Sequence, residues 1–318
     1  MKKSVGFIGL GKMGTAMVEH MLEEGIEVIC YNRSPEKVAE IAAKGAIPSY
    51  TYEEFIQKLR GAENRRCIIW LMVKSGSPVD EVLFGNAAEN MFLLPYLEKG
   101  DIIIDGGNSH YQDSKKRAEI MYDKQVSFLD CGTSGGILGA RHGACLMIGG
   151  DEKIYREIKW LFEILALPKG EKLVGPVGAG HYVKMVHNAI EYGMMQSIAE
   201  GMDLLENGAK ESLGAKLNLE QVLDVWNHGS IIDSYLTHVT QQALQKDPHL
   251  EKIEAFVEDN GEGAWTIMEA IKANVPFLTV CHALFMRYTT RQENSFAMKI
   301  VAAQRNEFGG HNVKYSEK

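Results

Sequence analysis

The feature that most constrains the fold is a glycine pattern near the N-terminus. Gly9-Leu10-Gly11-Lys12-Met13-Gly14 has the spacing G-x-G-x-x-G, follows an apolar run at 5–10 and opens a helical pattern at 13–24. In that setting the first glycine permits a tight turn, the second lets the backbone approach a pyrophosphate, and the third lets helix and strand pack closely. The pattern predicts a Rossmann domain that holds a dinucleotide at a helix N-terminus. A glycine-rich turn without a ligand is the alternative.

The end of the second predicted strand, 27–31, indicates which dinucleotide is bound. Enzymes that use NAD place an acidic residue here, where it contacts the ribose hydroxyls. This chain has Asn32-Arg33-Ser34 instead. Arg33 can pair with a 2′-phosphate and stack on an adenine, and Asn32 and Ser34 can donate hydrogen bonds. We therefore predict a preference for NADP, with a solvated Arg33 and relaxed specificity as the alternative.

Short apolar runs alternate with helical patterns through the first half of the chain, which predicts an α/β fold with a doubly wound parallel sheet. Further strands are expected at 67–73, 101–105, 127–131, 144–148 and 172–174, and a helix at 35–44. Later patterns are almost all helical, at 179–206, 218–227, 231–246, 249–257, 263–272 and 279–304. We predict an NADP-binding Rossmann domain at 1–177 and an all-helical domain at 178–318, ending in a polar tail.

Composition and charge exclude several classes of protein. There are 42 acidic and 34 basic residues, giving a formal net charge of −8, which argues against a nucleic-acid-binding surface. The five cysteines form no Cys-x-x-Cys pair and the histidines show no metal-ligand spacing, so we expect a reducing compartment and no metal. The apolar run at the N-terminus is too short for a signal peptide or a membrane span. We expect a cytoplasmic protein.

A polar stripe lies on the first predicted helix of the second domain. Lys184, His187, Asn188 and Glu191 are spaced at i, i+3, i+4 and i+7, which places them on one face. His and Asn are weak helix formers, and the stripe directly follows the glycine-rich hinge at 178–180. Taken alone, the stripe still favours an ordinary solvated face.

Two loops follow strands of the predicted sheet at the edge where ligands bind. Asn108 lies in Gly106-Gly107-Asn108-Ser109, directly after the strand at 101–105, and is a candidate for contact with substrate and nicotinamide. Ser134-Gly135-Gly136 follows the strand at 127–131 and can present backbone N–H groups to a carboxylate. Ordinary turns are the alternative for both segments.

Together these segments resemble the decarboxylating 6-phosphogluconate dehydrogenases over essentially the whole chain. The match includes Leu71-Met72-Val73-Lys74 and, most specifically, His187-Asn188-Ala189-Ile190-Glu191-Tyr192-Gly193. The wider β-hydroxyacid dehydrogenases share the Lys with an Asn four residues on, but not this His-Asn-x-Ile-Glu-Tyr-Gly run. The length resembles the short-chain form of the family. Ala264 departs from the pattern, since it stands where the family usually has Lys or Arg beside the substrate phosphate.

The resemblance implies NADP-dependent conversion of 6-phosphogluconate to ribulose 5-phosphate and carbon dioxide, as in the pentose phosphate pathway. Lys184 would be the general base and Glu191 the acid that protonates the final carbanion. Val73 and Lys74 would join Asn108 at the cofactor. The implied substrate contacts are Asn108, Ser134, Gly135, Gly136, His187, Asn188, Tyr192 and Arg287, together with Arg305 and His311 from the tail of a neighbouring subunit. A shared site of this kind implies a homodimer or homotetramer.

Two alternatives remain open from the sequence. One is another β-hydroxyacid dehydrogenase that acts on a non-phosphorylated acid, such as a 3-hydroxyisobutyrate or tartronate-semialdehyde enzyme, for which Glu191 and Arg287 would have no use. The other is a non-catalytic NADP-binding sensor, for which an acid–base pair would have no use.

Overall fold

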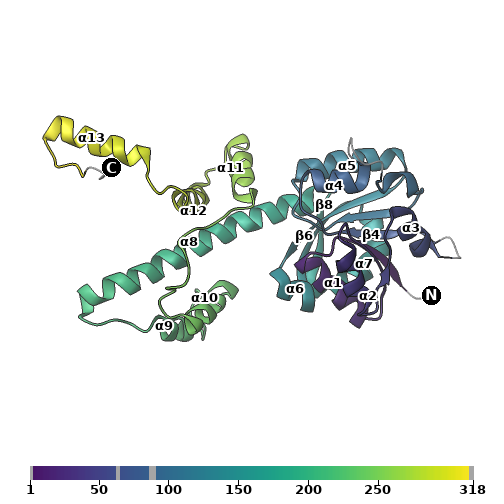
Figure 1. Ribbon diagram of the computed structural model, residues 1–318, viewed down its shortest axis with the longest axis horizontal. Helices are drawn as coiled ribbons and strands as arrows, with labels where there is room; N and C mark the ends of the chain where they lie inside the picture. The colour runs from purple at the N-terminus through teal and green to yellow at the C-terminus, as the bar shows by residue number, and fades with distance from the viewer. Residues whose placement is uncertain (1–2, 62–64, 86–90, 315–318) are drawn as a thin grey trace. The chain divides into compact units, whose positions relative to one another are not determined.

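The computed structural model describes residues 3–61, 65–85 and 91–314 (Figure 1). Met1 and Lys2 of the N-terminal segment and residues 315–318 of the tail lie outside the described residues. The chain divides into two compact units, Met1–His187 and Asn188–Lys318. The boundary predicted at 177/178 precedes a long helix, whose first turns group with the sheet unit rather than with the helical unit.

The first unit is built on one eight-stranded sheet with the order β3-β2-β1-β4-β5-β6-β7-β8. The strands are β1 (Ser4–Ile8), β2 (Glu27–Tyr31), β3 (Ile47–Pro48), β4 (Ile68–Leu71), β5 (Ile102–Asp105), β6 (Ser127–Ser134), β7 (Ala144–Gly149) and β8 (Ala166–Gly175). The chain crosses from one side of β1 to the other between β3 and β4, so the strand order reverses between β1 and β4. The carboxyl ends of these two strands are the edge at which open α/β sheets bind ligands.

The predicted parallel sheet is confirmed from β3 to β6, whereas β7 runs antiparallel to β6 and β8 parallel to β7. The link between β6 and β7 holds only the short helix α6 (Gly136–His142). A parallel crossover needs a dozen or more residues, so this link can only return the chain in the opposite direction.

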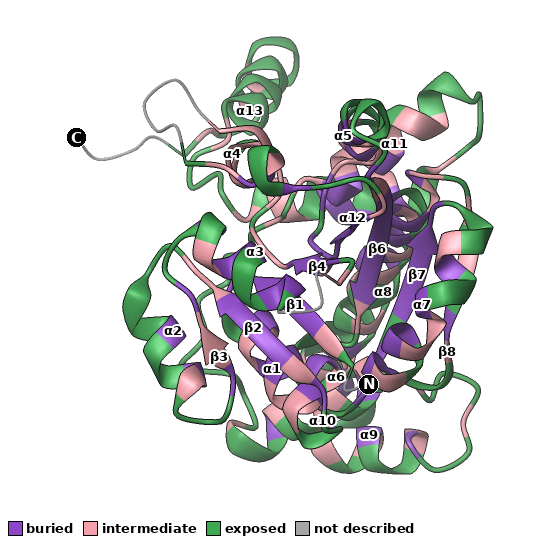
Figure 2. Ribbon diagram, turned by 90° about the vertical axis from the view of Figure 1, so that its right-hand side faces the viewer, coloured by how far each residue is buried: buried purple, intermediate pink, exposed green. Residues whose placement is uncertain are grey.

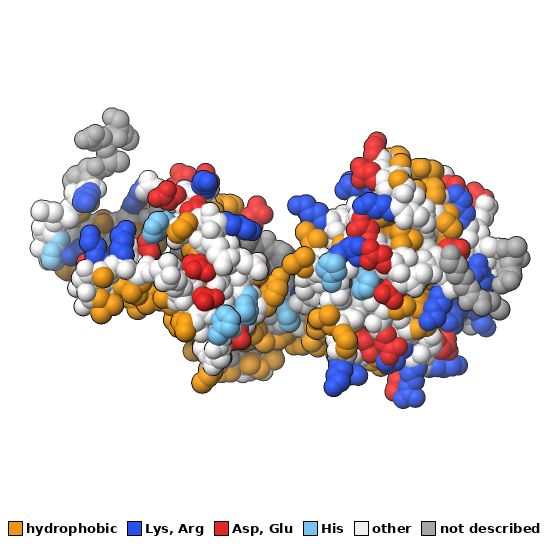
Figure 3. All heavy atoms as spheres, turned by 90° about the horizontal axis from the view of Figure 1, so that it is seen from below, with side chains coloured by type: hydrophobic (Ala, Val, Ile, Leu, Met, Phe, Trp, Pro, Cys, Tyr) orange, Lys and Arg blue, Asp and Glu red, His pale blue; other side chains and the backbone are white. Residues whose placement is uncertain are grey.

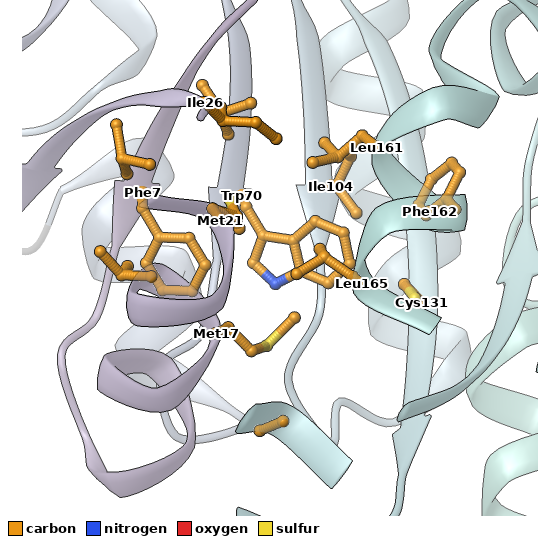
Figure 4. Close-up of a cluster of buried hydrophobic side chains, with 14 of the residues drawn as sticks. Phe7, Met17, Met21, Ile26, Trp70, Ile104, Cys131, Leu161, Phe162 and Leu165 are labelled. Atoms are coloured by element: carbon orange, nitrogen blue, oxygen red, sulfur yellow. The ribbon is translucent and has the colours of Figure 1, made fainter. Parts of the chain in front are cut away.

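Helices cover both faces of the sheet because alternate strand residues point to opposite sides. Besides α6, they are α1 (Lys12–Glu23), α2 (Pro35–Ala42), α3 (Tyr52–Arg60), α4 (Ser77–Phe84), α5 (Tyr111–Asp123) and α7 (Glu152–Leu165), with the 3₁₀ turn η1 (Leu94–Tyr96). In β4, Trp70 packs with Phe7 and Phe162 in one core (Figure 4), whereas Ile69 and Leu71 belong to the core on the other face. The strands are therefore buried on both sides (Figure 2).

The second unit contains helices throughout its described residues. They are α8 (Ala179–Leu213), whose first turns belong to the sheet unit, α9 (Leu219–Trp226), α10 (Tyr235–Lys246), α11 (Glu262–Lys272), α12 (Leu278–Thr289) and α13 (Phe296–Gly309). Two small apolar cores hold this unit, one around Leu223 and one around Leu284. None of the described helices combines the length and apolarity required to cross a membrane.

Two predicted helices were wrong. The segment 249–257 forms turns rather than a helix, and Leu250 has φ +51° there. The predicted helix at 279–304 is interrupted after Thr289 and becomes α12 and α13. At the break, the hydroxyls of Thr289 and Thr290 donate to the carbonyls of Met286 and Arg287, both at 2.7 Å. Hydroxyls bound in this way compete with the helical hydrogen-bond ladder, which explains why the helix ends.

Candidate active site

The predicted dinucleotide loop lies at the strand-order reversal and fits a pyrophosphate. A Cβ at Gly9 would lie 2.4 Å from the Met72 carbonyl oxygen, and one at Gly14 would lie 2.0 Å from the Gly9 carbonyl oxygen. These two glycines are therefore required by close packing of the chain itself. Gly11 differs, because a Cβ there would meet no atom within 4 Å. Gly11 is exposed and caps α1 without a side-chain hydrogen bond, so open space lies at this helix N-terminus, where a phosphate binds well.

The residues after β2 divide into a structural one and two exposed ones. Asn32 Oδ1 accepts a hydrogen bond from the Leu10 N–H at 2.9 Å, and Asn32 Nδ2 donates to the Ser34 carbonyl at 3.3 Å. Asn32 thus ties the glycine loop to the start of α2 and uses its amide within the chain. Arg33 and Ser34 are exposed, and Arg33 makes no hydrogen bond or ion pair with another described residue. Arg33 therefore remains a candidate for contact with a 2′-phosphate.

A buried charge network holds the loop that carries Asn108. The Asp105 carboxylate accepts hydrogen bonds from Gly107 N at 3.2 Å and from Ser109 Oγ at 2.7 Å. Arg117 Nη1 donates to the same carboxylate at 3.3 Å, and Arg117 Nη2 donates to the Gly76 carbonyl at 3.1 Å, beyond Val73 and Lys74. Asn108 is exposed between two buried neighbours. The network therefore fixes the loop while the Asn108 side chain stays accessible.

The beginning of α8 is fixed by a buried carboxylate that the sequence analysis missed. Asp130 on β6 accepts hydrogen bonds from the backbone N–H groups of Gly178 at 2.6 Å and His181 at 2.8 Å. Burial raises the pKa of Asp130, and the His181 side chain and these two N–H groups oppose that shift. His181 Nδ1 in turn lies 2.7 Å from Ser114 Oγ on α5. The first turn of α8 is therefore anchored to the sheet.

Replacing Asp130 with alanine is expected to lower the free energy of unfolding by about 1–3 kcal/mol, because two backbone N–H groups lose their acceptor in a buried place. The raised pKa means that the ionised carboxylate itself costs stability, which keeps the net loss small. Because the pKa of Asp130 is higher in the folded protein, its contribution to stability is greatest below about pH 4, the pKa of an Asp in the unfolded chain. That contribution decreases as the pH rises toward the pKa of Asp130 in the folded protein. Urea unfolding should show a wider gap between the two proteins at pH 4 than at pH 7. An equal difference in unfolding free energy at the two pH values would contradict a raised pKa for Asp130.

The polar stripe on α8 is not a solvated face. Lys184 is 6% exposed and Asn188 7% exposed, whereas the apolar Ile190 on the same helix is 52% exposed. A Cβ at Gly132 would lie 2.4 Å from Lys184 Cβ, so a glycine on β6 is what admits the lysine stem. Burying a charged side chain while leaving an isoleucine in solvent costs free energy. The stripe is therefore a candidate for binding or chemistry, and its burial contradicts the solvated-face interpretation.

Ser134 and His187 are brought together within the sheet unit. His187 Nε2 lies 3.2 Å from Ser134 Oγ, at the end of β6. Gly135 and Gly136 follow with φ +122° and +61°, conformations that favour glycine, and Gly136 begins α6. The predicted Ser134–Gly136 segment therefore begins beside His187 of α8.

A second group of predicted residues meets within the helical unit. The Tyr192 hydroxyl donates to Asn260 Oδ1 at 3.0 Å, and the Arg287 guanidinium lies 3.5 Å from the centre of the Tyr192 ring. Arg287 Nη1 also donates to the Glu258 carbonyl at 2.8 Å. Burial raises the pKa of Tyr192, with Arg287 opposing the shift. Tyr192 therefore remains a neutral phenol beside a cation.

Asn188 meets an acidic residue, Glu262, that the sequence analysis did not single out. Asn188 Nδ2 donates to Glu262 Oε2 at 2.6 Å, and Glu262 is 2% exposed. Glu262 and Asn260 are functional candidates whose only signal in the sequence was the Gly-Glu-Gly turn that opens α11.

The tail residues are not brought to the rest of the site in the single chain. Arg305 lies in the last turns of α13 and His311 just beyond it, and both are exposed. Neither side chain makes a hydrogen bond or ion pair with any other described residue. Within the described ranges, no group of three His, Cys, Asp or Glu side chains is arranged to hold a metal ion.

These observations define a class before any comparison is made. A Rossmann unit leads into a long helix on which a buried lysine precedes a half-buried carboxylic acid, Glu191, by two turns, about 10 Å along the axis. That arrangement combines a candidate dinucleotide site with an amine and a carboxyl group on one helix. The class is a nicotinamide-dinucleotide dehydrogenase with a helical second domain.

Comparison with known proteins identifies the family. Residues 4–175 match the NAD binding domain of 6-phosphogluconate dehydrogenase, and residues 180–299 match the C-terminal domain of 6-phosphogluconate dehydrogenase. The NAD(+)-dependent, decarboxylating 6-phosphogluconate dehydrogenase of Haloferax volcanii is 37% identical over 311 residues, covering 97% of this chain and 98% of that protein. The decarboxylating enzyme of Schizosaccharomyces pombe is 38% identical over 322 residues, covering 96% of this chain and 62% of that longer protein.

A solved structure agrees with these matches. The 6-phosphogluconate dehydrogenase of Plasmodium falciparum, described in its apo form and in complexes with NADP+ and 6-phosphogluconate, aligns with a TM-score of 0.79 at 31% identity. The alignment covers 98% of this chain and 66% of that chain. The chain belongs to the 6-phosphogluconate dehydrogenase family, and its match along nearly the whole Haloferax protein agrees with the short-chain form.

Proposed function

We propose that this protein oxidises and decarboxylates 6-phosphogluconate to ribulose 5-phosphate with NADP as the preferred acceptor. The observation that carries the proposal is the buried Lys184 on the same face of α8 as Glu191. A dehydrogenase that only oxidises a hydroxyl has use for the lysine alone. The acid two turns later suits a reaction that ends by protonating carbon.

The dinucleotide, when bound at the glycine loop, supplies the acceptor for the hydride that leaves C3 of the substrate. Lys184, as a neutral amine, removes the proton of the C3 hydroxyl as this hydride leaves. The resulting 3-keto acid has its ketone β to the C1 carboxylate. Lys184, now an ammonium, stabilises the negative charge that develops on the ketone oxygen.

Decarboxylation breaks the C1–C2 bond and releases carbon dioxide, leaving the electron pair in an enediol. Glu191, in its protonated form, delivers a proton to the carbon that has lost the carboxylate, which becomes C1 of ribulose 5-phosphate. Ser134, His187 and Asn188 hold the sugar acid. Because an ammonium group performs the electrophilic step, the chain's own residues account for the chemistry.

The test is an initial-rate assay of 6-phosphogluconate with NADP and then NAD, following reduced dinucleotide and carbon dioxide together. Equal amounts of both products, formed faster with NADP, are expected. Reduced dinucleotide without carbon dioxide would move the substrate to another hydroxy acid. Dinucleotide binding without any product would favour a sensor.

Arg33 is the proposed determinant of the dinucleotide preference, although the Haloferax relative carries an NAD(+)-dependent name. Replacing Arg33 with alanine should reduce the ratio of kcat/KM for NADP to that for NAD by about ten- to a hundredfold, because the charge-assisted pair with the 2′-phosphate is lost. The exposed Lys37, which lies on α2 four residues after Arg33, serves as the control, and Lys37→Ala should leave the ratio within twofold. An unchanged ratio in the Arg33 variant would show that the phosphate is read elsewhere.

We also propose that the protein works as a homodimer or homotetramer in which Arg305 and His311 complete a neighbouring subunit's site. The helical unit exposes many large apolar side chains, and several patches are visible in Figure 3. Those on α13 alone are Phe296, Met298, Ile300, Val301 and Phe308. Apolar surface on this scale is typical of subunit interfaces.

A further inference from the structure

We propose that Glu262 is a positioning residue that fixes the side-chain amide of Asn188. The inference rests on the proposed function, in which Asn188 contacts the substrate. Glu262 is the first residue of α11, and its Oε2 accepts a hydrogen bond from Asn188 Nδ2 at 2.6 Å. Glu262 is 2% exposed and Asn188 7% exposed, so the contact is almost free of solvent. In such surroundings a charge-assisted hydrogen bond is strong and directional.

The carboxylate is itself held in place from several sides. Asn260 Nδ2 donates to the same Glu262 oxygen, and the Glu262 backbone N–H donates to Asn260 Oδ1 at 3.2 Å. Asn260 Oδ1 also accepts from the Tyr192 hydroxyl at 3.0 Å. The N-terminus of α11 favours negative charge at its first residue. Glu262 Oε2 is therefore a fixed acceptor that ties the loop before α11 to α8.

A fixed acceptor determines which way the Asn188 amide points. An amide has a donor end and an acceptor end, whereas an ionised carboxylate only accepts. Turning the Asn188 amide over would place Oδ1 against the Glu262 oxygen, with repulsion in place of a hydrogen bond. Nδ2 therefore faces α11, and Oδ1 faces the opposite way. The Asn188 amide thus has one defined orientation toward the sugar acid.

The substitution Glu262→Gln tests this idea because glutamine has the same shape but can donate as well as accept. Both orientations of the Asn188 amide then become possible. We expect kcat/KM for 6-phosphogluconate to fall about tenfold or more, with the Kd for NADP within twofold of wild type. In an Asn188→Ala background the same substitution should change kcat/KM less than twofold, because no amide remains to be oriented.

Asp259→Asn is the matched control. Asp259 lies in the same loop but pairs with Arg291 at 2.6 Å and accepts from Gly261 N at 2.9 Å, a bond that asparagine keeps. Its kcat/KM should stay within about twofold of wild type. An equal loss from Glu262→Gln in both backgrounds, or no loss in either, would overturn the proposal.

A wild type that does not turn over 6-phosphogluconate would instead overturn the proposed function. In that case the energetic coupling between Glu262 and Asn188 is measured by urea unfolding of four proteins: the wild type, Glu262→Gln, Asn188→Ala and the double variant. Non-additive losses support the fixed contact, and additive losses contradict it.

Discussion

Replacing Lys184 with methionine is expected to lower kcat by about a thousandfold or more while binding of NADP survives. Methionine fills a similar volume in the buried site but cannot take the C3 hydroxyl proton, and general-base catalysis of this kind contributes about 10²–10⁴-fold. The lost ammonium also leaves the ketone oxygen without its stabilising charge during decarboxylation. The glycine loop at the end of β1 and Arg33 are untouched, so the dinucleotide should bind as before.

Lys210→Met is the control for this experiment, because Lys210 is exposed near the end of the same helix. Its turnover should equal that of the wild type. Initial rates give kcat, and fluorescence titration with NADP gives the dissociation constant. A Lys184→Met protein that retains more than a tenth of wild-type turnover would remove Lys184 as the base.

Local patterns in the sequence were sufficient for the Rossmann half of the fold. Gly14 is required by a contact inside one strand–turn–helix unit, Gly9 has a φ of +104° in the turn itself, and the buried strands read as continuous apolar runs. The reversal at β7 was missed because strand direction depends on the length of the preceding link, which resembled any other loop in sequence. The break at Thr290 was missed because its cause is a side-chain hydrogen bond and not a glycine or proline.

The site shows the same division between local and long-range information. The helical spacing of Lys184 and Glu191 is local, and it was found. Their setting depends on partners far along the chain: Gly178 meets Asp130 across 48 residues, and Asn188 meets Glu262 across 74. A single sequence gives no pattern for such pairs. The burial that distinguishes this stripe from a solvated face could therefore come only from the structure.

Removing residues 305–318 is expected to reduce kcat/KM for 6-phosphogluconate by about 10²–10⁴-fold, because the substrate contacts that we propose for Arg305 and His311 are lost. The double variant Arg305→Ala, His311→Ala should show a similar loss without shortening α13. Both side chains are exposed and make no hydrogen bond with other described residues, so the fold of the subunit should persist. Circular dichroism and NADP titration check the fold, and a fully active double variant would contradict the tail's role.

Subunit complementation distinguishes a shared site from one completed within the same chain. The Lys184→Met subunit keeps its tail but lacks the base, and the truncated subunit keeps Lys184 but lacks the tail. If tails are exchanged, each mixed dimer contains one complete site, because the tail of the first subunit serves Lys184 of the second. Co-expression in equal amounts should then give about a quarter of wild-type activity, since random pairing makes half of the dimers mixed. Activity no higher than that of the two variants measured separately would show that each tail serves its own subunit.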